Sequence, residues 1–193
     1  YFKLKIKTLS TPLKVLFFYL IFSLLNEFIC FWFFSRTANS YVYNVFTFVE
    51  GLSIIVIYKN IIQSEKNGLY FLALIVFFSL CFAVSGLLGQ LSKHSPFLLT
   101  VETVIVIALS ITYFFRLINN VLIPKLTDYY LFWLNTSFLI YFCGSLFIFI
   151  FENFILYNQD KNMRNLWILH NFFNIVYNIL LAKSIYTWKK TRP

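Results

Sequence analysis

Residues 69–90 read LYFLALIVFFSLCFAVSGLLGQ, a stretch without a single charged side chain. An α-helix needs about 20 mainly apolar residues to cross the hydrocarbon core of a bilayer. The apolar run is continuous and does not alternate with polar residues, which indicates a helix and not a strand of a membrane β-barrel. This stretch therefore predicts a helical integral membrane protein.

Five further stretches have a similar length and apolar character. With the first they give six predicted transmembrane helices, at residues 12–34, 41–62, 69–90, 97–118, 130–151 and 165–188. Pro12 and Pro96 each follow a hydroxyl residue at the start of a stretch, where proline is tolerated in a first helical turn. The sequence thus predicts an all-α membrane protein with one helical-bundle domain over residues 1–193.

The composition supports this fold class. Hydrophobic residues make up 60% of the 193 residues, charged residues make up 12%, and the mean hydropathy is +0.77. Soluble domains average about 45–50% apolar and about 25% charged residues. The three cysteines, Cys30, Cys81 and Cys143, lie in apolar runs and match no metal pattern. The composition argues against a soluble enzyme and a disulfide scaffold, and we expect no metal or cofactor.

The net charge of +9 is spread unevenly over the two sides of the predicted bundle. Twelve Lys and Arg residues lie in the two tails, the second–third loop and the fourth–fifth loop, whereas the other side holds Arg36, Lys93, Lys161 and Arg164. The positive-inside rule places both observed ends in the cytoplasm. Because the basic residues form no single face, no nucleic-acid partner is expected.

Several polar side chains lie at membrane depth, in the middle or outer half of the predicted helices. An ionisable group at the centre of a span costs about 2.5–3.5 kcal/mol, so each calls for a reason. The candidate cavity residues are Glu27, Asn44, Glu50, Glu102, His170, Asn171 and Asn174. They predict a small polar cavity, open or nearly open to the outside.

Helical spacing places some of these residues on common faces. Tyr43, Asn44, Thr47, Glu50 and Gly51 share one face of the second helix, and His170, Asn174 and Asn178 share one face of the sixth. Both faces are expected to point into the bundle. The alternative is that the polar groups only join helices through hydrogen bonds worth about 0.6 kcal/mol each. We favour this alternative for the asparagines, a satisfied histidine near the membrane interface for His170, a functional role for Glu50 and Glu102, and neither reading for Glu27.

A faint internal repeat relates residues 43–50, YNVFTFVE, to residues 170–177, HNFFNIVY. Asn, one Phe and one Val coincide, and both segments run from the outside to the inside in the predicted topology. Such a repeat would be parallel, as in the sugar transporters called SWEETs. It supports a small-solute transporter as the alternative function.

The segments PFLLTVETVIVIALSITYFFRLI and YYLFWLNTSFLIYFCGSLFIFIFEN carry a resemblance. The second has a Tyr-Phe-x-Gly-x-x-Phe centre, formed here by Tyr141, Phe142, Gly144 and Phe147. With this motif the chain resembles a family of uncharacterised bacterial seven-helix integral membrane proteins. The resemblance implies a further helix before Tyr1 and a bacterial inner (cytoplasmic) membrane that the chain crosses several times, and the charge distribution predicts a cytoplasmic C-terminus. It implies no catalytic residue.

No GxSxG, HExxH, GxGxxG or P-loop pattern occurs in the sequence. The leading hypothesis is therefore a non-enzymatic membrane protein, either a sensor of a small external ligand or an accessory subunit of a larger complex. The expected partners are the lipid bilayer and another integral membrane protein. A lipid-modifying enzyme is a third option, and it would need a nucleophile or metal site that the spacing does not identify.

Overall fold

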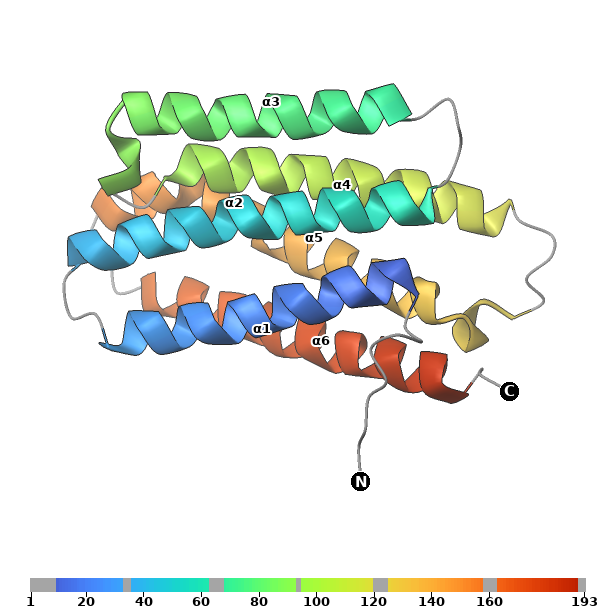
Figure 1. Ribbon diagram of the computed structural model, residues 1–193. Coiled ribbons are helices and arrows are strands. Elements are labelled where there is room, and N and C mark those ends of the chain that lie inside the picture. The colour runs from blue at the N-terminus through green and yellow to red at the C-terminus, as the bar shows by residue number, and fades with distance from the viewer. Residues whose placement is uncertain are drawn as a thin grey trace. The chain divides into compact units, whose positions relative to one another are not determined.

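The computed structural model describes residues 10–32, 36–62, 68–92, 95–119, 125–157 and 163–190, without the side chains of 36–39, 149–157 and 163–167. Within these residues the chain is helical and forms no strand, which confirms the all-α fold (Figure 1). The elements are α1 (Thr11–Trp32), α2 (Arg36–Ile61), α3 (Gly68–Leu87), the short 3-10 helix η3 (Gln90–Ser92), α4 (Pro96–Ile118), a second 3-10 helix η4 (Leu126–Asp128), α5 (Tyr130–Tyr157) and α6 (Met163–Lys190).

Five of the described helical stretches are long and apolar enough to cross a membrane. They are Thr11–Trp32, Ser40–Ile61, Gly68–Leu87, Pro96–Ile118 and Tyr130–Ile148. The protein is thus a multi-spanning membrane protein. The sixth predicted helix exists as α6, but it is not among the five, because its middle carries His170, Asn171, Asn174 and Asn178. That α6 crosses the membrane stays a prediction.

The predicted orientation depends on loop residues of which the structure describes only some. Lys66, Lys93 and Lys161 lie outside the described residues, as do the side chains of Arg36 and Arg164. The cytoplasmic position of both observed ends therefore also stays a prediction.

The chain divides into two compact units, unit 1 (Tyr1–Glu102) and unit 2 (Thr103–Pro193), with the boundary inside α4. In unit 1, α1 packs along α2, and α2 packs along α3 (Figure 1). The α1–α2 contact includes the stacked rings of Phe22 and Phe46, whose centroids are 6.0 Å apart. Phe48 of α2 stacks on Phe82 of α3 at 4.4 Å. Aromatic packing thus holds α2 between its two neighbours.

The turn between α3 and α4 has identifiable signals. Gly89 has a φ of 67°, the left-handed conformation that commonly ends a helix, and its N–H donates to the carbonyl oxygen of Gly86 at 3.0 Å. The α4 helix starts at Pro96, and the hydroxyl of Ser95 accepts a hydrogen bond from the backbone N–H of Leu98 at 3.5 Å. The predicted pairing of a capping hydroxyl with Pro96 is therefore confirmed.

In unit 2, α5 packs along α6 (Figure 1). Gly144 permits this close approach, because a Cβ at that position would collide with the ring of Phe173. Phe138 and Phe142 of α5 are buried, as are Tyr177 and Leu181 of α6. The motif around Gly144 is thus part of the contact between α5 and α6.

The buried face of α6 differs from the polar face that the sequence predicts. Tyr177, Leu181 and Ser184 are buried, whereas Asn178 and Asn171 are exposed. The reason is aromatic packing, because the Tyr177 ring lies 4.9 Å from the Tyr141 ring and so turns the neighbouring stripe away from α5. The expectation that the His170–Asn174–Asn178 stripe points into the bundle is wrong for Asn178.

Candidate functional site

The polar face predicted for α2 is confirmed as a buried face, because Asn44, Thr47, Glu50 and Gly51 are all buried. Glu50 is only 8% exposed. The hydroxyl of Tyr19 on α1 donates a hydrogen bond to Oε1 of Glu50 at 2.6 Å. This short bond to a carboxyl oxygen fixes Glu50 against the buried side of α1.

Glu102 on α4 is buried even more deeply, at 2% exposure. Among the described residues its Oε1 atom has no hydrogen-bond partner. The same atom lies 3.2 Å from the position that a Cβ on Gly51 would occupy. Glu102 therefore packs against α2 at the one position where that helix has no side chain, directly beside Glu50.

A hydrogen bond at the end of the turn between α3 and α4 aligns α2 with the start of α4. As a result Glu50 and Glu102 lie at the same depth along the two helices. Oδ1 of Asn44 accepts from the backbone N–H of Ser95 at 3.3 Å. Glu50 follows Asn44 by about 9 Å of helix, and Glu102 follows Ser95 by about 10 Å, at 1.5 Å per residue. Both helices run in the same direction from this point, which brings the two carboxyl groups near enough to interact electrostatically. We call Glu50 and Glu102 the acidic pair.

The surroundings of the acidic pair within unit 1 are apolar. Phe78 of α3 is fully buried, and its ring fills the space over Gly51, with Cε1 2.5 Å from a Cβ built there. The same ring stacks on Phe48 at 5.8 Å. Burial in such an environment strengthens the electrostatic interaction between the two carboxyl groups.

No basic side chain compensates the acidic pair in the part of the chain that the structure describes. Neither carboxyl group forms an ion pair there, and the only groups that interact with them electrostatically or through side-chain hydrogen bonds are each other and Tyr19. Two carboxylates in close contact repel each other, and both are desolvated. The arrangement can therefore take up a positive charge.

Asn44 has a structural role at the edge of this site. Its Nδ2 donates to the carbonyl oxygen of Leu91 at 3.0 Å while its Oδ1 accepts from Ser95. Its amide thus ties α2 to η3 and to the start of α4. These contacts favour the alternative of hydrogen bonds that join helices.

Glu27 lies apart from the acidic pair. Its side chain is exposed on α1, although the neighbouring Asn26 is buried. The structure therefore gives Glu27 no place beside Glu50 and Glu102.

His170, Asn171 and Asn174 belong to unit 2. Nδ1 of His170 lies 3.3 Å from Oγ of Ser145, and the His170 ring lies 5.8 Å from the ring of Tyr141. Oδ1 of Asn174 accepts a hydrogen bond from Asn178 on the same helix at 2.7 Å. Ser145 is fully buried, so the Ser145–His170 contact offers no accessible nucleophile.

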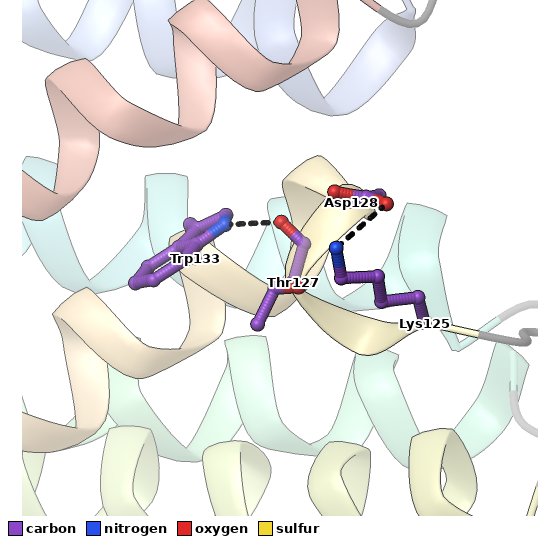
Figure 2. Close-up of polar contacts among 4 residues, drawn as sticks. All are labelled: Lys125, Thr127, Asp128 and Trp133. Carbon is purple, nitrogen blue, oxygen red and sulfur yellow. Dashed lines mark hydrogen bonds and ion pairs between the residues drawn. The ribbon is translucent and has the colours of Figure 1, made fainter.

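The end of unit 2 near η4 holds a second polar group of residues. Figure 2 shows the indole N–H of Trp133 donating to the carbonyl oxygen of Thr127 at 2.8 Å, and Nζ of Lys125 lying 3.7 Å from Asp128. Nζ of Lys183 on α6 lies 5.5 Å from the centre of the Trp133 ring. These groups are exposed or paired, and they hold the end of α5.

Two contributors to the site were not predicted as such. Tyr19 is one of 13 tyrosines in the chain, and nothing in its sequence context distinguishes it as a donor to Glu50. Phe78 likewise sits in an apolar run. Gly51 was placed on the correct face, and the only signal of its role is that it follows Glu50 directly.

Within the described residues, no group of three or more His, Cys, Asp or Glu side chains could hold a metal ion. In comparisons with protein families, curated proteins and solved structures, the chain finds no match.

Proposed function

We propose that this protein is a sensor in the bacterial inner membrane that binds a small external ligand at the acidic pair and signals through a second membrane protein. The observation that carries the proposal is the buried Oε1 of Glu102, which has no hydrogen-bond partner among the described residues. A ligand at this atom supplies the missing partner.

A buried oxygen atom without a hydrogen-bond partner, such as Oε1 of Glu102, costs free energy in the folded protein. Leaving a buried acceptor unsatisfied costs about 1–3 kcal/mol, and more for a charged group. An asparagine could join the same helices without this penalty, as Asn44 does at the nearby turn. The cost at Glu102 is offset when the ligand binds, which gives the bound and free states different stabilities.

The ligand reaches the site from the outside. The predicted orientation puts the turn of Leu91 and Ser95 on the external side, about 10 Å of helix from Glu102. The polar residues of α2 between this turn and Glu50, Asn44 and Thr47, lie on the buried face. They lead from the turn toward the acidic pair.

The transporter alternative receives less support from the described residues. Its internal repeat equates Asn44 with Asn171, but Asn44 is buried and bonded to η3, whereas Asn171 is exposed. Two positions with such different surroundings do not form equivalent halves of a substrate site. The sensor is therefore the function that we propose.

A membrane partner completes the proposal. Many large apolar side chains are exposed along the helices, among them Phe31, Leu72 and Phe147. Lipid tails cover such surfaces, and a helix of another protein can cover them equally well, because both are apolar. A change at the acidic pair reaches the cell interior through that partner.

Thermal unfolding of the purified protein in lipid nanodiscs tests the binding site. The probes are changes of pH and separate additions of sodium chloride, choline chloride and glucose. A ligand that binds only the folded state raises Tm, so at least one probe is expected to shift Tm in the wild type and not in Glu50→Gln/Glu102→Gln. Equal responses of the two proteins to every probe contradict the proposal.

A further inference from the structure

We infer that the ligand of the acidic pair is a single proton, held by Glu102 and shared with the carboxylate of Glu50. This inference rests on the proposed function, because it names the chemistry of the same site. The charges of Glu50 and Glu102, the oxygen atoms near them and the hydrogen bonds around them support this inference.

The acidic pair needs a positive charge. Glu50 and Glu102 are both buried, they interact electrostatically, and the described residues place no Lys, Arg or His against them. Two neighbouring carboxylates in apolar surroundings are disfavoured relative to a pair that holds one proton. The ligand class is therefore a cation, and its size decides among the candidates.

A metal cation or an organic ammonium group fits the site poorly. In secondary transporters with discontinuous helices, backbone carbonyl oxygens of the unwound segments coordinate sodium. Here α2 and the start of α4 are continuous helices, and the Phe78 ring occupies the space above Gly51. Among the described residues, the oxygen atoms that interact with the acidic pair are those of its own two carboxyl groups and the Tyr19 hydroxyl. A proton needs only two of them.

The hydrogen bonds assign the proton to Glu102. Glu50 accepts from the Tyr19 hydroxyl, which stabilises it as the carboxylate. Oε1 of Glu102 has no hydrogen-bond partner among the described residues, so a proton bound at this atom supplies the missing partner and can be donated to the carboxylate of Glu50. One O–H bond forms when the proton arrives from bulk water, and the same bond breaks when the proton returns there. The charge of the acidic pair changes from −2 to −1 on binding.

Besides the two carboxyl groups, the phenol of Tyr19 is the titratable group that contacts the acidic pair among the described residues of unit 1. Tyr19 faces them from α1, and Phe78, which does not titrate, faces them from α3. Gly51 of α2 carries no side chain. Lys59 is exposed at the far end of α2, about 13 Å of helix beyond Glu50.

Loss of the proton provides the signal. Two carboxylates held side by side repel each other, so deprotonation pushes α4 away from α2 at Gly51. The Asn44–Ser95 hydrogen bond anchors the other end of this contact. Proton binding from the outside thus changes how the start of α4 packs on α2.

Infrared spectroscopy of the protein in nanodiscs tests the inference. At neutral pH the wild type is expected to show the carbonyl stretch of a buried protonated carboxyl, shifted by exchange into deuterium oxide. Glu102→Gln should abolish this band, Glu50→Gln and Tyr19→Phe should move it, and Asp128→Asn, in an exposed turn, should leave it unchanged. The band should disappear in one step as the pH is raised.

Each outcome decides between the claims. Absence of the deuterium-sensitive band in the wild type overturns the inference. This result needs only the wild-type protein, so it holds even when a variant fails to fold. Loss of the band on replacing choline chloride with sodium chloride at constant pH assigns the site to sodium and also overturns the inference. If the band is absent but another probe shifts Tm, only the inference fails. If the band is present but Tm of the wild type and Glu50→Gln/Glu102→Gln respond equally, the proposed function fails.

Discussion

Units 1 and 2 both bury polar side chains, but they treat them differently. In unit 2, Nδ2 of Asn135 donates to the carbonyl oxygen of Ser110 at 3.2 Å, and Oγ of Ser184 donates to that of Tyr130 at 2.9 Å. In unit 1, Glu102 is equally buried, yet its Oε1 has no partner among the described residues. Uncharged amides and hydroxyls therefore join helices in unit 2, as Asn44 does in unit 1, but unit 1 also holds a buried carboxyl oxygen without a partner among the described residues. The difference teaches that burial alone does not mark a site, whereas a buried carboxyl oxygen without a hydrogen-bond partner does.

The largest expected effect comes from filling the space beside the acidic pair. Gly51→Ala places a Cβ 2.5 Å from Cε1 of the buried Phe78 and 3.2 Å from Glu102 Oε1. Overpacking of a rigid core costs about 1–3 kcal/mol, and we expect the upper end because Phe78 is fully enclosed. Denaturant titration of the purified protein measures the free energy of unfolding.

Two other glycines serve as controls for Gly51→Ala. Gly144→Ala meets the Phe173 ring, which is half-buried and can turn away, so its loss should be smaller. A Cβ on Gly68 meets nothing within 4 Å, so Gly68→Ala should not destabilise the protein by crowding. Equal losses for Gly51→Ala and Gly68→Ala would show that Gly51 is not tightly enclosed.

The second prediction is that Glu102→Leu stabilises the folded protein. Leucine fills a similar volume and removes the unsatisfied oxygen, so the free energy of unfolding should rise by about 1–3 kcal/mol. Glu102→Leu should also abolish the response of Tm to pH that depends on the acidic pair. Denaturant titration measures the gain in the free energy of unfolding. A loss of stability would show that Glu102 is a structural residue.

The third prediction is that removing a buried polar side chain from unit 2 destabilises the protein, in contrast to Glu102→Leu in unit 1. Asn135→Ala leaves the Ser110 carbonyl without the side-chain amide that it accepts from, and we expect a loss of about 1 kcal/mol. Asn178→Ala is the matched control, because Asn178 is exposed and donates its hydrogen bonds to Asn174 on the same helix. A gain in stability for Asn135→Ala would remove the contrast between the units.

The smallest expected effect concerns Lys183. Its ammonium group lies over the rings of Trp133 and Tyr186, at 5.5 and 5.8 Å, and an exposed cation–π contact is worth about 0.5–1 kcal/mol. Lys183→Met should lower the stability by about that amount. Lys59→Met, at an exposed position of α2, is the comparison, and an equal loss there would mean that the aromatic contact adds nothing.

The fold and half of the site could be read from the sequence. Long apolar runs predict spanning helices because the bilayer fixes their length, and the spacing of Asn44, Thr47 and Glu50 predicts a buried face because lipid disfavours polar groups. The buried face of α6 could not be predicted in this way. In a membrane-spanning α6, as the sequence predicts, Leu181 and Tyr177 would gain little from leaving lipid, so packing geometry and not hydrophobicity would select that face. The Tyr19–Glu50 hydrogen bond joins residues 31 positions apart, and no local pattern records it.

The central claim is that the folded protein holds a proton at Glu50 and Glu102 which the unfolded chain releases. Counting the protons released on unfolding at neutral pH, with an indicator dye in weakly buffered solution, tests it most directly, because proton linkage compares the two states without reference to activity. The account predicts that the wild type releases a single proton more than Glu50→Gln/Glu102→Gln does. Equal release by the two proteins would contradict it.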